Sequence, residues 1–212
     1  MRVVIFGSTS LIAKELNTLY SKYEIFNIDR NHNIFLEENF LSKCNIFREN
    51  DIIVYLSSIL QQKRIEDQTY SQIFESCKVN AILPIRIIKY LNKNIKRFTF
   101  CYVSSESAKK GSFDDSYSIF KAAVDNFIRE FYLISTDSRI FSIAPSTINS
   151  GMTLGRKDVD RVEFYKNSHR KKRFIEVNEF AKIIAILCSE EFTYLSNTSI
   201  EINGGKFARN KY

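Results

Sequence analysis

Short apolar runs rich in β-branched residues alternate with amphipathic stretches along the whole chain. The apolar runs predict strands at 2–6, 24–28, 51–56, 97–104, 138–144 and 198–202. Apolar residues at helical spacing predict helices over 14–23, 65–91, 116–134 and 177–189, with Pro84 expected to kink the second. Strands that alternate with helices are typical of a parallel sheet covered on both faces. The pattern therefore predicts an α/β fold of the Rossmann type, a doubly wound parallel sheet.

Composition limits the class of protein. The chain has 212 residues, 44% hydrophobic and 26% charged, which is enough for one well-buried domain over residues 1–212. Its four cysteines form no C-x-x-C pair, so neither a disulfide framework nor a metal site is predicted. Neither a signal peptide nor a membrane-spanning run is recognisable. We expect a cytoplasmic protein that does not associate with a membrane.

The formal charge of +7 raises the question of an anionic partner. Much of the excess lies between Arg156 and Arg173, a segment that ends in the run His169-Arg170-Lys171-Lys172-Arg173. No nucleic-acid-binding motif accompanies it, so we expect no nucleic acid partner. The segment favours an anionic small-molecule substrate, and a solvated surface run is the alternative.

The first strand leads into a turn that suits a dinucleotide. The turn and the helix start contain Gly7, Ser8, Thr9, Ser10, Leu11 and Ile12. Backbone N–H groups at such a helix start can hold a pyrophosphate. Asp29, at the end of the second strand, stands where such units place an acidic partner for the ribose hydroxyls, and Arg30 follows it. A carboxylate there favours NAD, whereas Arg30 could pair with the extra phosphate of NADP.

Tyr117 and Lys121 are four positions apart at the start of a predicted helix, so both side chains project from one face. A nearby cation favours a phenolate and lowers the pKa of a tyrosine. Lowering it from about 10 to about 7 takes roughly 4 kcal/mol, which requires a partly buried site or a second positive charge, such as an oxidised nicotinamide. With 11 tyrosines in the chain, about one Tyr-x-x-x-Lys is expected by chance. The pair alone is therefore weak evidence.

Several further motifs, in order along the chain, resemble those of the short-chain dehydrogenase/reductase family. The turn from Gly7 to Ala13 resembles T-G-x-x-x-G-I-G, and Tyr117 with Lys121 matches Y-x-x-x-K. The other matches are Asn80 in Val-Asn-Ala, Val103-Ser104-Ser105, Ala144-Pro145-Ser146 through Gly151-Met152-Thr153, and Phe180 through Gly205. The resemblance covers nearly the whole chain.

The resemblance implies an NAD(P)-dependent oxidoreductase that interconverts a carbonyl and a hydroxyl. Tyr117 would be the general acid or base, and Asn80 would hold a relay water. Lys121 would bind the cofactor ribose. The reacting oxygen would be bonded by Ser105, which the Ser-Ser alignment favours, or by Ser104, which the family's spacing to the tyrosine favours. The cofactor-binding residues implied are Gly7, Ser8, Thr9, Ser10, Leu11, Ile12, Asp29, Arg30, Ser57, Ser58, Tyr117, Lys121, Pro145, Ser146 and Ile148. A homodimer or homotetramer is also implied.

Three features depart from the family pattern. Leu11 replaces the second glycine, Ser57-Ser58 replaces N-A-G, and residues 31–50 are too few for the usual helix and third strand. We therefore expect a sheet trimmed at one edge. The first two departures leave open a non-catalytic dinucleotide sensor or scaffold on the same fold.

Overall fold

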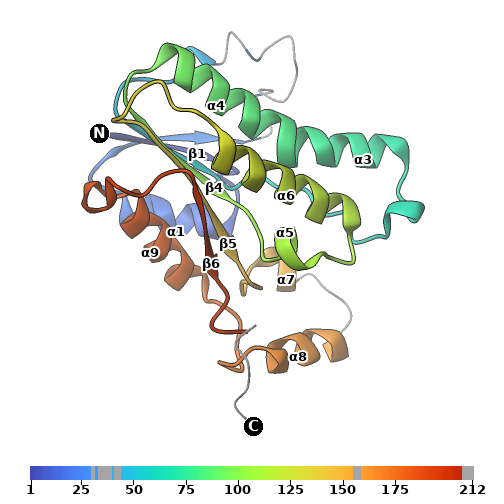
Figure 1. Ribbon diagram of the computed structural model, residues 1–212. Coiled ribbons are helices and arrows are strands. Elements are labelled where there is room, and N and C mark those ends of the chain that lie inside the picture. Colours follow the sequence, from blue (N-terminus) through green and yellow to red (C-terminus); the bar gives the residue numbers. More distant parts are fainter. Residues whose placement is uncertain (30–31, 33–39, 41–43, 155–158, 207–212) are drawn as a thin grey trace.

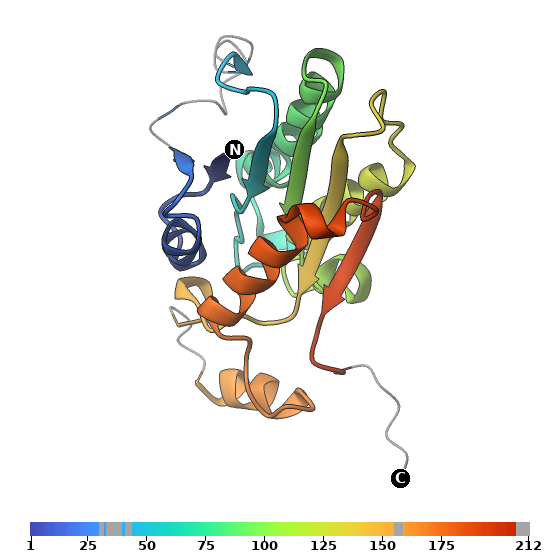
Figure 2. The same ribbon diagram turned by 90° about the vertical axis from the view of Figure 1, so that its left-hand side faces the viewer.

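The sheet is the frame on which the site is built. A computed structural model of the chain describes residues 1–29, 32, 40, 44–154 and 159–206. Its six strands lie in the order β2-β1-β3-β4-β5-β6, and every neighbouring pair is parallel (Figures 1 and 2). They are β1 (Arg2–Phe6), β2 (Glu24–Ile28), β3 (Asp51–Tyr55), β4 (Phe98–Val103), β5 (Arg139–Pro145) and β6 (Thr198–Ile202). The predicted Rossmann-type parallel sheet is confirmed.

The strand order reverses between β1 and β3. From β1 the chain goes first to β2 on one side and then to β3 on the other. In sheets of this kind, ligands bind beyond the carboxyl ends of the strands at the point of reversal. On the other side of β1, β2 is the last strand that the described residues form. Much of segment 31–50 lies outside these residues, so the trimmed edge stays a prediction.

Helices cover both faces of the sheet. One face carries α1 (Leu11–Leu19) and α9 (Val177–Cys188), and α9 crosses in front of the strands in Figure 2. The other carries α3 (Tyr70–Cys77), α4 (Leu83–Asn94) and α6 (Asp115–Glu130) (Figure 1). Because side chains alternate along a strand, Val3 and Ile5 pack under α1 and α9 while Val4 and Phe6 pack on the other side.

The helical region predicted over 65–91 is divided. A 3₁₀ turn, η2 (Ile65–Asp67), precedes α3, and a π-helical turn, η3 (Lys78–Ile82), joins α3 to α4. Pro84 lies in the first turn of α4, immediately after the π turn, so the irregularity is a widened turn rather than the simple kink predicted.

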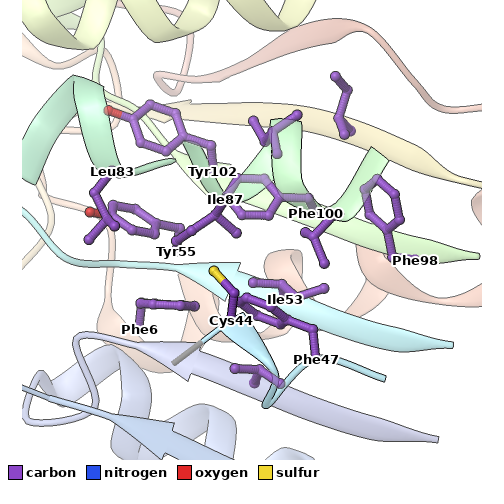
Figure 3. Close-up of a cluster of buried hydrophobic side chains, with 14 of the residues drawn as sticks. Phe6, Cys44, Phe47, Ile53, Tyr55, Leu83, Ile87, Phe98, Phe100 and Tyr102 are labelled. Carbon is purple, nitrogen blue, oxygen red and sulfur yellow. The ribbon is translucent and has the colours of Figure 1, made fainter. Parts of the chain in front are cut away.

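Tyr55 and Tyr102 stabilise this π turn from the sheet. The Tyr55 hydroxyl donates to the Val79 carbonyl at 2.6 Å, and the Tyr102 hydroxyl donates to the Asn80 carbonyl at 2.7 Å. Pro84 has no N–H to give to these carbonyls, which lie five and four residues before it. Both phenols are fully buried in the cluster shown in Figure 3, and together they supply donors to carbonyls of the turn at the point where Pro84 supplies none.

Other boundaries also differ from the sequence predictions. Helix α1 begins at Leu11, before the predicted start, because the Ser10 hydroxyl accepts a hydrogen bond from Ala13 N and caps it. The region predicted as a loop after Pro145 contains α7 (Gly151–Leu154) and α8 (Val159–Ser168). The short elements α5 (Ser107–Lys110) and η4 (Glu190–Phe192) complete the described structure. Within the described part of the chain, none of the helices is both long and apolar enough to cross a membrane.

Candidate active site

A cleft of about 1290 Å³ runs beyond the carboxyl ends of the central strands. The predicted site residues that line it are Thr9, Ser10, Leu11, Ile12, Ser58, Ser105, Tyr117, Lys121, Pro145, Ser146 and Ile148. Gly7, Ser8, Asp29, Ser57 and Asn80 are not part of its lining, and Arg30 lies outside the described residues. The structure thus brings together residues that span more than half of the chain.

At one end of the cleft the turn after β1 approaches β3 closely. Gly7 has a φ of +82°, and a Cβ atom on it would lie 2.9 Å from the backbone nitrogen of Ser57. Both the left-handed conformation and the close contact require glycine. Leu11 is the first residue of α1 and lines the cleft with its side chain half exposed.

Asp29 follows β2 and is partly exposed. Its carboxylate lies 3.0 Å from His32 Nδ1, and its backbone N–H donates to the same nitrogen. The His32 ring also packs against Phe26. The sequence analysis assigned no role to His32. The spacing of three residues is the only signal that could have suggested the contact.

Tyr117 is held in the first turn of α6. Asp114 caps the helix, and its Oδ1 accepts from Tyr117 N at 3.1 Å. Burial raises the pKa of Tyr117, and hydrogen bonds from the Ser105 and Ser58 side chains oppose that rise, while the charges of Asp114 and Asp125 add to it. We had predicted a lowered pKa. The protein's own groups raise the pKa instead, because burial and two carboxylates outweigh the two hydroxyls.

Lys121 lies one turn further along α6 and is 1% exposed. Its ammonium donates to the Val103 carbonyl at 2.8 Å and lies 5.7 Å from the centre of the Tyr117 ring. Burial lowers the pKa of Lys121 to about 7, although the charge of Asp125 acts in the opposite direction. The lysine therefore loses much of its charge near neutral pH and gives Tyr117 only weak electrostatic support.

The two adjacent serines after β4 point to different places. Ser104 also lines the cleft, but its hydroxyl is buried and donates to Asp125 Oδ2 at 2.8 Å. The Ser105 hydroxyl accepts from Ser107 N at 3.1 Å and lies close enough to the Tyr117 phenol to lower the pKa of that phenol. In extended backbone, successive side chains point to opposite sides, so the side chains of Ser104 and Ser105 face different surroundings. Ser105 is thus the serine placed beside the tyrosine.

Asn80 lies in the π turn and is fully buried. Its amide donates to the Ile59 carbonyl at 2.8 Å and to Ser76, and it accepts from Ile59 N and from the Ser58 hydroxyl, both at 3.0 Å. The residue thereby fixes the segment after β3, and its partner Ser58 lies close enough to Tyr117 to lower the pKa of the phenol. The relay water implied by the family resemblance stays a prediction.

The basic run predicted to attract an anionic substrate lies beside the cleft rather than in it. None of Arg170, Lys171, Lys172 and Arg173 is among the residues that line the cleft. Arg173 pairs with Glu179 at 2.7 Å, and Lys172 donates to the Asn167 carbonyl. The cations that do line the cleft are Arg64, Lys110 and Lys121, and Lys110 is paired with Glu106. Among the described residues, no group of three or more His, Cys, Asp and Glu could hold a metal ion.

Comparisons with known proteins identify the family and agree with the fold. The family model described as enoyl-(acyl carrier protein) reductase, of the short-chain dehydrogenase class, matches residues 12–206. The chain therefore belongs to the short-chain dehydrogenase/reductase family. A search of curated proteins gave no match.

Solved structures of low sequence identity share the fold. A short-chain dehydrogenase family protein from Francisella tularensis has a TM-score of 0.83 and 16% identity, covering 98% of this chain and 99% of its own. A short-chain dehydrogenase/reductase described as glucose/ribitol dehydrogenase from Brucella melitensis has a TM-score of 0.83, 18% identity and coverage of 98% and 97%. A small-chain dehydrogenase in complex with NADPH has a TM-score of 0.84, 16% identity and coverage of 99% of each chain.

Proposed function

We propose that this protein is an NAD(P)-dependent oxidoreductase that interconverts a carbonyl and a hydroxyl on a small, anionic, sugar-type compound. NAD is the preferred cofactor in this proposal, and NADP is the alternative. The observation that carries it is the convergence of Tyr117, Ser105 and Lys121 in a cleft whose other end is the Gly7 turn and the start of α1. A reducing compartment, the cytoplasm, is proposed on the four free thiols.

The residues present fit a dinucleotide. The tight turn at Gly7 and the free N–H groups at the start of α1 suit a pyrophosphate, and Pro145, Ser146 and Ile148 line the cleft near Tyr117. When bound, the nicotinamide would supply or accept the hydride. Lys121 would reach the ribose hydroxyls from the floor of the cleft.

The proton chemistry belongs to the protein. Because its pKa is raised, Tyr117 carries its proton at neutral pH and is suited to donate it to a carbonyl oxygen as that oxygen gains negative charge. The Ser105 hydroxyl holds the same oxygen. The nearby Ser105 and Ser58 side chains oppose the rise of the Tyr117 pKa, and so favour the phenolate that the transfer leaves. Alcohol oxidation needs the phenolate at the outset and thus a further positive charge near the ring.

The test measures cofactor consumption with a panel of keto sugars and keto acids, together with calorimetric binding of NAD⁺ and NADH. Tyr117→Phe should lower kcat at least 100-fold while leaving cofactor affinity nearly unchanged, because only the proton donor is lost. Lys121→Ala should reduce both kcat and cofactor affinity. Ser105→Ala should reduce kcat more than Ser104→Ala, whose hydroxyl faces Asp125.

Two outcomes contradict the proposal. If Tyr117→Phe keeps more than about a tenth of the wild-type kcat, Tyr117 is not the general acid. Cofactor binding without turnover across the panel would favour the sensor or scaffold.

A further inference from the structure

One buried carboxylate joins the start of α6 to the segment 59–68, which follows β3. Asp114 is 1% exposed. Its Oδ1 accepts from Tyr117 N at 3.1 Å, Ser116 Oγ at 2.9 Å and Gln68 Nε2 at 3.0 Å. Its Oδ2 accepts from the backbone N–H groups of Gln61 and Gln62, at 2.5 and 3.3 Å. The two oxygens thus have separate tasks, one capping the catalytic helix and the other fixing the segment.

The segment is held in a strained conformation at Gln62. That residue has a φ of +56°, in the left-handed region that side chains other than glycine and asparagine rarely adopt. Its side chain is exposed and lines the cleft, as do those of Leu60 and Arg64. A strained residue that faces a cleft, and that the surrounding contacts hold in place, points to a role in binding.

Arg64 is placed at the Tyr117 end of the cleft. Its guanidinium lies 5.1 Å from the centre of the Phe113 ring and 3.5 Å from the Asp115 carboxylate. The ion pair is long and half exposed, so the guanidinium retains N–H groups that can bind an incoming anion. Arg64 can therefore take the role that the sequence had suggested for the basic run.

We propose that segment 59–64 is a substrate-binding wall, in which Gln62 and Arg64 bind a carboxylate or phosphate and a neighbouring hydroxyl of the substrate. Asp114 is the positioning residue that sets this wall relative to Tyr117. This inference rests on the proposed function, since it assigns the substrate contacts of the same site. In this proposal the anionic group of the substrate binds to Arg64 rather than to Arg170 or Lys171.

The first test is Gln62→Gly, which should preserve or raise stability but weaken substrate binding. Gln62→Gly relieves the left-handed strain, so its Tm should be equal to or above that of the wild type. Loss of the amide should nevertheless raise KM at least fivefold with little change in kcat, for the panel compound with the highest kcat/KM. The matched control is Asn50→Gly, at another left-handed position with a φ of +63°, before β3 and away from the cleft. It should leave KM unchanged.

The second test separates the two tasks of Asp114. Asp114→Asn keeps an oxygen for Tyr117 N but turns an amide N–H₂ toward the N–H groups of Gln61 and Gln62, which releases the segment. Trypsin should then cut after Lys63 or Arg64 at least tenfold faster than in the wild type, and KM should rise more than kcat falls. Proteolysis needs neither substrate nor cofactor, so it also reports on a protein without turnover.

The outcomes distinguish this inference from the proposed function. A wild type without turnover overturns the proposed function and the substrate contacts with it, whereas an active Tyr117→Phe overturns only the role of Tyr117 as general acid. An active wild type whose Gln62→Gly variant keeps the wild-type KM overturns the binding wall alone. An unchanged rate of cleavage in Asp114→Asn overturns the role of Asp114.

Discussion

Lys121 is the residue whose ionisation connects the site to stability. Burial lowers its pKa from 10.5 to about 7 in the folded protein. Between these two values the unfolded chain binds more protons than the folded one, so stability contributed by this group rises with pH across the window. The slope is at most about 1.4 kcal/mol per pH unit. Below the folded pKa the full cost of burying the ammonium is present.

Lys121→Met removes this titration while keeping an apolar chain of similar length. The difference in unfolding free energy between the variant and the wild type should therefore move in favour of the wild type as pH rises from about 7 to about 9.5. Urea unfolding at both pH values measures it. Parallel pH profiles would show that Lys121 is fully charged in the folded protein.

Asp29 is the residue on which cofactor choice depends. A carboxylate accepts hydrogen bonds from both ribose hydroxyls but repels a 2′-phosphate. We expect kcat/KM for NAD(H) to exceed that for NADP(H) at least about tenfold, or 1.4 kcal/mol, and Asp29→Ala to reduce the ratio. His32 Nδ1 lies 3.0 Å from the same carboxylate, so His32→Ala is the companion variant that removes this contact. Equal use of both cofactors by the wild type would mean that Asp29 does not govern the pocket.

At the scale of elements, the pattern of apolar residues along the chain is sufficient to predict the strands of the sheet. The same pattern does not predict the π turn. The buried parallel strands β1 and β3 are continuous apolar runs, which can be recognised within one segment. The π turn depends on Tyr55 and Tyr102, which lie 24 and 22 positions away from the carbonyls that they bond. The spacing of apolar residues within the helix carries no information about hydrogen-bond donors on the sheet, so the π turn could not be predicted from it.

Tyr102→Phe should destabilise the fold by about 1–3 kcal/mol, because the Asn80 carbonyl would be left buried without this donor. Denaturant unfolding measures the change. Tyr194→Phe is the control, since its side chain is fully exposed and loss of its hydroxyl should cost nothing. If the two variants are equally stable, the bond to the π turn contributes nothing net.

At the scale of the whole molecule, the site joins segments that are far apart in sequence. Tyr117 and Lys121 were recognisable because a helix fixes their relation over four residues. The contact of Asp114 with Gln61 joins residues 53 positions apart. The basic run follows α8, and its place beside the cleft depends on how α8 packs in the fold. Such relations are set by tertiary packing, which the spacing of residues in one segment does not encode.

The molecule also has apolar side chains on its outer surface that suit the expected homodimer or homotetramer. Tyr70 and Phe74 stack on α3 with an interplanar angle of 10°, and Ile119 is exposed on the adjacent α6. Light scattering coupled to size exclusion should give a mass of two or four chains, and Phe74→Asp should lower it. A monomeric wild type would show that these side chains do not form an interface between subunits.

The π turn restricts the order in which this protein can change during evolution. As long as Pro84 withholds an N–H from the turn, loss of either Tyr55 or Tyr102 uncovers a buried carbonyl. Replacing Pro84 first would restore one helical N–H, after which one of the two phenols could become phenylalanine at a smaller cost. The three positions lie on α4, β3 and β4, so an alteration in the helix has to precede those in the sheet. Lineages that lost a tyrosine first would pass through a less stable intermediate, and selection would remove most of them.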